Sequence, residues 1–358
     1  MIPLTLLTSI GHITIERRYL ACATCKAKSI PWNLWAGVSE RRLTEPARRM
    51  LTLAGMTWSF DLAAKRLAEL CHLQVSDDTI ERVCQEEGQQ AQQFMNESPA
   101  PAAAFQAKGE AEFYTDGVQV NTVDGWREMR VSVLARRESA LSATPDQWDQ
   151  RVLPEPTVRL GVCAIAAANL VGSSWKRLAA AAGLDLQEPL SVIGDGAKWI
   201  WDQAAKRFGP NTQWTVDVFH VSQHLHAAAK QMLGDSPMAS QWARCQLEHL
   251  LEVQGPKFIE ELDRQIQATA NATNREALQK LRNYLNDNRD SLWYRQRLAA
   301  GRPIGSGLIE GCCKNTIGAR LKLNAARWRI RRVERIGALR CLDYSNLWDA
   351  FWRDRATA

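Results

Sequence analysis

The spacing of apolar residues along this chain predicts helices and strands in successive blocks. Residues 44–93 carry apolar side chains at helical spacing in three consecutive segments. Helical spacing returns at 175–182, from Trp199 to Phe208 and throughout 221–300. Short alternating or β-branched runs predict strands at 111–120, 126–135, 158–166, 190–193 and 212–219. This order predicts an α/β domain that is interrupted by an all-helical insertion.

The pattern and the local composition together divide the chain into six parts. A Pro/Ala-rich stretch between the first helices and the first strand marks the clearest linker. The short turn between the second and third helices gives the N-terminal helices a helix-turn-helix outline. The third helix begins with Asp77 and Asp78, which would repel phosphates, so helix packing or dimerisation is an equal alternative. The parts are a basic N-terminal segment, a helical domain, a linker, the first part of the core, the helical insertion, and the completion of the core with basic helices, at 1–43, 44–97, 98–108, 109–220, 221–300 and 301–358.

Positive charge is concentrated at the two ends of the chain. The 358 residues carry a formal net charge of +6, which is a modest excess for this length. Between residues 320 and 340, many Arg and Lys residues face a single acid, Glu334. Such one-sided basic stretches favour a polyanion partner, and two solvated helix faces are the alternative. The residues expected to contact the polyanion are Arg320, Lys322, Arg327, Arg329, Arg331 and Arg332.

Cysteines and apolar runs indicate the cellular setting. Nine cysteines occur mostly singly, which argues against a disulfide framework and for a reducing cytosol. Cys22 and Cys25 form a Cys-x-x-Cys pair, which supplies two of the four ligands of a tetrahedral zinc site. His12 is the nearest further candidate, so a pair that binds no Zn²⁺ is the alternative. No apolar run has the length of a membrane-spanning helix, and the first residues lack the pattern of a signal peptide.

Three acidic residues beside glycines form the candidate catalytic set. Asp116 stands at an expected break in the first strand, Asp195 at the end of the fourth, and Glu310 on a late helix. If the first and fourth strands are neighbours, these carboxylates converge and repel unless a cation lies among them. Oxygen ligands of this kind suit Mg²⁺ or Mn²⁺, and two such ions about 3.5–4 Å apart assist an in-line displacement at phosphorus. The alternative is that Gly194-Asp195-Gly196 is only a turn.

Four motifs in this order resemble those of a known group of enzymes. They are Tyr114-Thr-Asp116-Gly117, Gly194-Asp195-Gly196 followed by Trp199, Asp217-Val-Phe-His220, and Gly305-Ser306-Gly307 followed by Glu310. With these motifs, the chain from about Arg17 to its C-terminus resembles the DDE transposases of the ISKra family of bacterial insertion sequences. That family is related to the ISLre and Mutator-like groups.

This resemblance implies a fold, an activity and a setting. The fold would be a ribonuclease-H-like core in which Asp116, Asp195 and Glu310 hold Mg²⁺ or Mn²⁺, while Asp217 and His220 shape the site or position DNA. The activity would be metal-dependent cleavage and strand transfer at the ends of an insertion sequence. The partners would be double-stranded DNA of the terminal inverted repeats and of the target, bound by a homo-oligomer in the bacterial cytoplasm, in association with the nucleoid. Trp328 would stack on or wedge between bases. Relatives carry a fuller cysteine knuckle before the segment 17–22, so a truncated N-terminus is a further expectation.

Two other functions remain open from the sequence. A ribonuclease-H-like nuclease, such as a junction resolvase, would share the acids without strand transfer. A helix-turn-helix DNA-binding protein would keep the acids only as turn residues, and a defective transposase copy would fold but be inactive because its N-terminus is short. In the structural alternative, His220 would be a strand-end histidine bonded to a backbone carbonyl, and His224 and His226 would belong to a solvated helix face.

Overall fold

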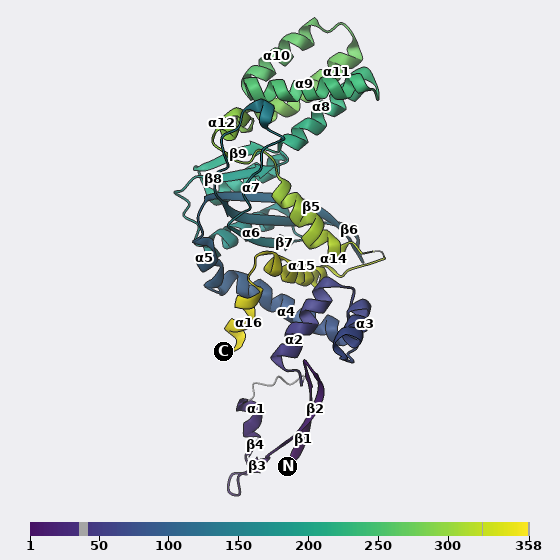
Figure 1. Cartoon of the computed structure of the whole chain (residues 1–358), viewed down its shortest axis with the longest axis vertical. Helices are drawn as coiled ribbons and strands as arrows, with labels where there is room; N and C mark the ends of the chain where they lie inside the picture. The colour runs from purple at the N-terminus through teal and green to yellow at the C-terminus, as the bar shows by residue number, and fades with distance from the viewer. Residues whose placement is uncertain (36–41, 324, 357–358) are drawn as a thin grey trace.

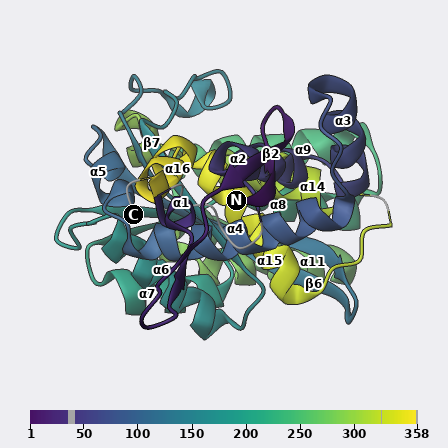
Figure 2. The same ribbon diagram turned by 90° about the horizontal axis from the view of Figure 1, so that it is seen from below.

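The computed structural model describes residues 1–35, 42–323 and 325–356; residues 36–41 of the predicted N-terminal segment lie outside the described part. The chain forms an N-terminal arm, a mixed α/β body and a helical unit at the end opposite the arm (Figure 1). Seen from the arm, the N-terminus lies in front of the middle of the body (Figure 2). The arm consists of β1 (Ile2–Thr8), β2 (Gly11–Arg17), β3 (Leu20–Ala21), β4 (Lys28–Ser29) and α1 (Pro31–Trp35).

A five-stranded sheet forms the centre of the body, with the order β7-β6-β5-β8-β9. Its first three members are antiparallel neighbours, and β8 and β9 then continue parallel to β5. The mixed α/β class that the sequence predicts is therefore confirmed. The strands are β5 (Glu110–Thr122), β6 (Gly125–Arg137), β7 (Val158–Ala164), β8 (Leu190–Gly194) and β9 (Thr212–Val216).

Helices cover both faces of this sheet. One face packs on α6 (Ala168–Ala181) and α7 (Lys198–Phe208), where the ring of Phe113 contacts Trp175 and Phe208. The other face is crossed by a helical stretch from 307 to 321 and by α15. That stretch consists of α13 (Gly307–Gly311), the π-helix η3 (Cys312–Gly318) and α14 (Ala319–Leu321), and it is followed by α15 (Ile330–Tyr344) and α16 (Trp348–Ala356).

The three predicted N-terminal helices are present, and they pack into the core of the body. They share one hydrophobic cluster with the sheet, and the long third helix lies along α15. The Pro/Ala-rich stretch predicted as a linker contains a short helix instead, because Phe105 is buried against that core. These elements are α2 (Glu45–Thr57), α3 (Phe60–Cys71), α4 (Asp77–Glu97) and α5 (Ala100–Phe105).

The helical unit has its own hydrophobic cluster, which runs from Val216 to Ile304 with Ala143 added. This agrees with the helical periodicity of 221–300, and the first helix begins earlier than predicted. The unit comprises α8 (Val218–Leu233), α9 (Pro237–Val253), α10 (Gly255–Ala268), α11 (Ala272–Asp287), the short 3₁₀ turn η2 (Arg289–Ser291) and α12 (Tyr294–Ala299); a further 3₁₀ turn, η1 (Pro145–Gln147), lies between β6 and β7. No helix in the described ranges is both long and apolar enough to cross a membrane.

Two predicted strand boundaries are wrong, and both matter for the site. The strand carrying Asp116 does not break at Gly117, because its antiparallel partner continues and pairs Gly117 with Arg130. The fifth strand does not reach His220. It ends at Val216, since Asp217 caps the helix that starts at the next residue.

Candidate functional site

Three aspartates lie side by side where the parallel strands end. The register pairs Tyr114 with Ile193, so Asp116 on β5 and Asp195, directly after the end of β8, follow that pair by two residues each. Gly194 pairs with Val216, which places Asp217 next to Asp195 in the same row. Neighbouring strands are about 4.8 Å apart, and residues in register point to the same face. The sequence expectation that Asp116 and Asp195 converge is therefore supported by the strand order.

Backbone amides fix the carboxylates of Asp116 and Asp195 locally. One oxygen of Asp116 accepts a hydrogen bond from the amide of Gly117 at 2.7 Å. One oxygen of Asp195 accepts a hydrogen bond from the amide of Ala197 at 2.8 Å. Among the described residues, the second oxygen of each carboxylate accepts no hydrogen bond, and both side chains are half-buried. Each aspartate therefore retains an oxygen that a cation can take.

Asp217 has a different role from its two neighbours. Its side chain is 3% exposed and accepts hydrogen bonds from the amide of Phe219, at 2.8 Å, and from the hydroxyl of Ser306. Ser306, which the sequence suggests as a helix cap, thus donates to Asp217 rather than capping α13. This contact ties the segment before α13 to the end of β9, so Asp217 positions the helix that carries Glu310.

The helical unit holds the loop around Asp195 in place. The hydroxyl of Tyr284 donates to the carbonyl of Asp195 at 3.1 Å. The amide oxygen of Asn288 accepts from the indole of Trp201 at 3.0 Å and lies against Gly196. Gly196 has φ +89°, and an added Cβ would lie 3.0 Å from Asn288 Oδ1. The glycine after Asp195 therefore serves a left-handed turn and a close contact with α11.

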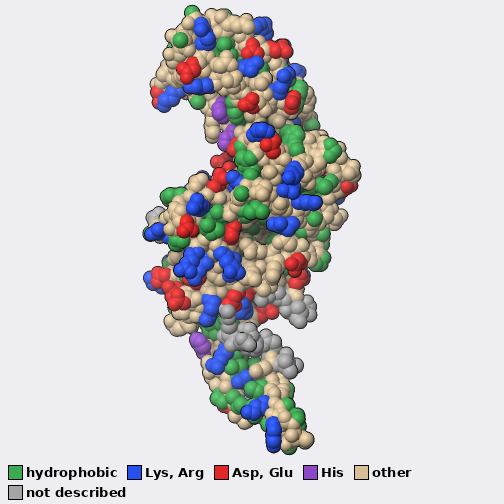
Figure 3. Space-filling model, turned by 180° about the vertical axis from the view of Figure 1, so that it is seen from behind, with side chains coloured by type: hydrophobic (Ala, Val, Ile, Leu, Met, Phe, Trp, Pro, Cys, Tyr) green, Lys and Arg blue, Asp and Glu red, His purple; other side chains and the backbone are tan. Residues whose placement is uncertain are grey.

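His220 lies in the first turn of α8 and faces Asp116. Its charge lowers the pKa of Asp116, so the two groups interact electrostatically. One turn later, the ring of His224 stacks on Tyr284 with centroids 3.6 Å apart, so it is not merely solvated. Partial burial and the His220 charge both lower the pKa of His224. Figure 3 shows histidine side chains in the notch between the helical unit and the body, with acidic side chains beside them.

The pKa of Asp116 reports the electrostatics of the site. Burial makes the largest contribution and raises this pKa, and the nearby charges of Asp195 and Glu128 raise it further. The Gly117 amide and His220 oppose that shift. Ionising Asp116 therefore works against its burial and the repulsion of Asp195, and a bound cation would relieve that repulsion.

Glu310 approaches this group without joining it. It is exposed on α13, one turn before Cys313. Burial raises the pKa of Cys313, and the nearby charges of Asp116 and Glu310 raise it further. Within the described ranges, no three His, Cys, Asp or Glu side chains are grouped closely enough to hold one metal ion.

The donor set of Asp116 and Asp195 fits a hard divalent cation. Mg²⁺ in proteins is typically held by one or two carboxylates, with waters and substrate phosphates completing the octahedron. The two aspartates supply that number of carboxylates from adjacent strands. Glu310 would reach the ion only if its helix moved or if the substrate closed the gap.

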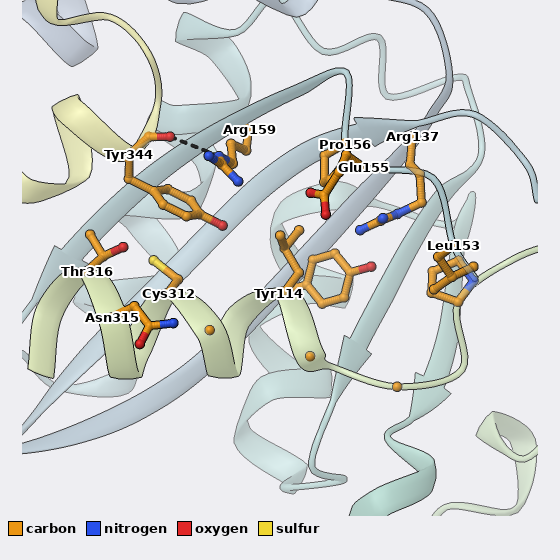
Figure 4. Close-up of a pocket in the computed structure, with 15 residues that line it drawn as sticks. Tyr114, Arg137, Leu153, Glu155, Pro156, Arg159, Cys312, Asn315, Thr316 and Tyr344 are labelled. Carbon is orange, nitrogen blue, oxygen red and sulfur yellow. Dashed lines mark hydrogen bonds between the residues drawn. The ribbon is translucent and has the colours of Figure 1, made fainter. Parts of the chain in front are cut away.

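A cavity of about 560 Å³ lies behind the helical stretch that carries Glu310. Helix positions Leu308, Gly311 and Asn315 line it, whereas Glu310 and Cys313 lie on the other side of the same stretch. Figure 4 shows Tyr344 and Arg159 reaching into this space, with the Nε of Arg159 donating to the carbonyl of Tyr344 at 3.0 Å. The cavity and the aspartates are therefore separated by that helix.

The exposed basic surface contains fewer of the predicted residues than the sequence suggests. Arg320 is 2% exposed and lies against the rings of both Phe60 and Trp328, so it is not part of the exposed basic surface that the sequence predicts. Trp328 is 8% exposed and donates its indole N–H to the carbonyl of Leu321, which leaves no free face for stacking on bases. The exposed members of the predicted set are Lys322, Arg327, Arg329, Arg331 and Arg332, the last of which pairs with Glu81 at 2.6 Å.

Cys22 and Cys25 lie in the turn between β3 and β4. Both are exposed, and the amide of Cys25 approaches the sulfur of Cys22 at 3.5 Å. These backbone and side-chain hydrogen bonds lower the pKa of Cys22, which favours the thiolate form that binds metals. The turn thus has the geometry of half a zinc site, and His12 does not complete a three-ligand group among the described residues.

Sequence reasoning missed the residues that support the aspartates from a distance. Tyr284, Asn288 and Tyr294 lie in the helical unit, and their hydrogen bonds reach the carbonyl of Asp195, the indole of Trp201 on α7 and the carbonyl of Val216 at the end of β9. Their spacing in the sequence is that of ordinary helix residues. Only the Asn at the end of α11 carries a local signal, since it stops a helix.

No protein-family model matches the chain, and a search among curated proteins finds no match for it. The function is therefore argued from the geometry of the site.

Proposed function

We propose that this protein is a DDE transposase that cleaves and joins DNA at the ends of a bacterial insertion sequence. The observation that supports this most is the pair of aspartates on β5 and just after β8, near the helix that carries Glu310. The strand order, with an antiparallel hairpin and third strand followed by two parallel strands, is that expected for a ribonuclease-H-like core. The helices between β9 and α13 would be the insertion that the resemblance implies.

Asp116 and Asp195 would hold Mg²⁺ or Mn²⁺, and Glu310 would complete the set when DNA is bound. The cation would activate the attacking water or 3′-hydroxyl and stabilise the leaving oxygen. The chain itself positions these groups, because the Ser306–Asp217 contact holds the start of α13 against β9. His220 adjoins Asp116 and would orient DNA near the cut.

Exposed Lys and Arg side chains on the C-terminal segment would bind the phosphate backbone of double-stranded DNA. Lys322, Arg327, Arg329 and Arg331 are exposed and without a salt bridge among the described residues. Figure 3 shows Lys and Arg side chains gathered on the face below the notch. The protein would act as a homo-oligomer on element ends and target DNA, in the bacterial cytoplasm. The Cys22–Cys25 turn would hold Zn²⁺ only with ligands from elsewhere.

A strand-transfer assay with pre-cut element ends and a plasmid target tests the proposal. Asp116→Asn and Asp195→Asn are expected to abolish joined products while retaining DNA binding. Asp202→Asn is a matched control, because Asp202 is an exposed surface residue that pairs with Lys198. Equal activity of Asp116→Asn and Asp202→Asn would refute the assignment.

Glu310→Gln separates the role of Glu310 from that of the aspartates. Since Glu310 does not touch the pair in the free protein, its variant should lose joining yet keep the stabilisation that Mg²⁺ gives to the free chain. Loss of both properties would show that Glu310 is already a ligand without DNA. The same assay also distinguishes the other functions: nicks without joined products indicate a nuclease, and DNA binding without either product indicates a DNA-binding protein.

A further inference from the structure

A second feature of the C-terminal segment is a pocket of about 450 Å³ that no part of the proposed chemistry uses. It lies where the start of α3, the N-terminal part of α4 and the segment between α14 and α15 meet. Arg320, Arg327, Arg329 and Arg332 line it, and Glu81 is the acid among the lining residues. Four guanidinium groups against one carboxylate make the pocket strongly cationic.

The base of this pocket contains a guanidinium that is not fully satisfied. Arg320 is 2% exposed; its Nε donates to the carbonyl of Gly55 at 3.0 Å. Its buried Nη2 has no hydrogen-bond partner in the described part of the chain. The guanidinium lies against the rings of Phe60 and Trp328, with its central carbon 4.9 Å and 5.1 Å from the two ring centroids. A buried charged donor without a partner is costly, so its retention points to an anionic ligand.

The rim of the pocket supplies donors that are free to close on a ligand. Arg327 and Arg329 are exposed on the segment that leads into α15. Glu81 pairs with Arg332 at 2.6 Å and also interacts with Arg320, so a single carboxylate is shared among the arginines of the pocket. A planar guanidinium group can donate two parallel hydrogen bonds to two oxygens of one phosphate, which makes Arg the preferred residue for such a site.

We propose that these four arginines form a phosphate-binding cradle with Arg320 as its floor. A phosphate group can come from the DNA backbone or from a free phosphate-bearing molecule, and the charge of the cradle suits both. The DNA source rests on the function proposed above and deepens it by naming one contact.

The position of the cradle relative to the aspartates gives this contact a distance. Trp328 pairs with the end of β5, since its amide donates to the carbonyl of Asn121 at 3.0 Å. From Asp116 to Thr122 the strand advances six residues, or about 20 Å at roughly 3.3 Å per residue. The cradle therefore lies beside the far end of β5, about 20 Å along the strand from Asp116.

The test uses the full chain, with inorganic phosphate as one probe and a non-specific DNA duplex as the other. The variants Arg327→Gln and Arg329→Gln change exposed side chains, so they are expected to fold. Phosphate should raise the Tm of the wild-type protein relative to chloride at equal ionic strength, and each variant should lose that rise. Each variant should also lower the slope of log K against log[salt] for the duplex by about one.

Arg264→Gln is the matched control, because it removes the same charge from an exposed position on α10. Arg320→Lys tests the floor by keeping the charge and removing the guanidinium, and it should abolish the phosphate effect. If Arg320→Lys does not fold, the two exposed variants alone decide.

The outcomes separate the two sources of phosphate. Loss of both effects, or of the salt slope alone, supports a DNA phosphate; loss of the Tm rise alone supports a free phosphate-bearing ligand. Variants at Arg327 and Arg329 that behave like Arg264→Gln in both measurements overturn the cradle. Because both measurements use uncut DNA or no DNA, they remain decisive even if strand transfer is never observed.

Discussion

Replacing Gly196 by alanine should destabilise the protein more than an equivalent change at a free glycine. Gly196 has φ +89°, and L-residues pay about 1–3 kcal/mol in such backbone conformations. The new Cβ would also lie 3.0 Å from Asn288 Oδ1 and 3.1 Å from its Nδ2. Asn288 is 4% exposed and is held by hydrogen bonds to Trp201 and Tyr284, each 3.0 Å long.

The contact with Asn288 should therefore add to the backbone cost. Shifting Asn288 weakens two hydrogen bonds, each of which contributes about 0.5–1.5 kcal/mol, so the additional loss is about 1–3 kcal/mol. Gly209 provides the control, because it has φ +80° and nothing within 4 Å of an added Cβ. Gly196→Ala should thus lower the free energy of unfolding by about 1–3 kcal/mol more than Gly209→Ala does.

Urea denaturation of the two variants, at one pH and without metal, measures this difference. In an Asn288→Ala background the additional penalty of Gly196→Ala should disappear, which a double-mutant cycle detects. Equal destabilisation of Gly196→Ala and Gly209→Ala, with additive behaviour in the cycle, would refute the close contact. The loop that carries Asp195 would then not be fixed by α11 through this pair.

Three further predictions concern the aspartates and the core. Because burial and the Asp195 charge raise the pKa of Asp116, its ionised form is less favourable in the folded chain than in the unfolded one. Asp116→Asn should therefore raise the urea midpoint at pH 7, and this gain should shrink as the pH falls and vanish below the ordinary pKa of 3.8. Mg²⁺ at ten times its Kd should add about 1.4 kcal/mol to the free energy of unfolding of the wild type and nothing to that of the variant. Ser306→Ala leaves a buried carboxylate oxygen of Asp217 without its donor and should cost about 1–3 kcal/mol in urea titrations, unlike Ser173→Ala, whose hydroxyl is exposed. Glu87→Gln removes one of the two carboxylates that pair with Arg48 and should cost about 1–3 kcal/mol in urea titrations, because Glu86 still pairs with Arg48 at 3.0 Å. Asp61→Asn, in an exposed pair with Lys65, should cost less than about 1 kcal/mol.

The spacing of apolar residues located the strands and helices of the body well, because a half-buried strand repeats every second residue and a half-buried helix every three to four. It failed at Asp116-Gly117, a pair that usually marks a turn. Here the partner strand continues past it, and a Cβ at Gly117 would lie 2.5 Å from Glu128 Oε1. The glycine thus permits close approach of a cross-strand side chain, which no local pattern distinguishes from a turn.

The basic segment shows a second limit of sequence reasoning. A run of arginines predicts exposed charge, yet Arg320 is buried because its partners come from α2 and α3, more than 250 residues earlier. The carbonyl of Gly55 and the ring of Phe60 are available only once the N-terminal helices pack against the end of β5. Exposure of a charged residue is therefore a property of the assembled fold, and the sequence identifies only its residue type.

The helical unit is part of the site, because its side chains end on the loops that carry the aspartates. Tyr284 donates to the carbonyl of Asp195, and Tyr294 donates to the carbonyl of Val216 at 2.9 Å, directly before Asp217. Both contacts are made by residues about 80–90 positions later in the chain than the loops they hold. Replacing the unit by a short linker would free both loops, so the loss would reach the geometry of Asp195 and Asp217 and not only a surface for DNA. The acids converge because the strands set their register, and they stay in place because the helices after β9 close over the strand ends.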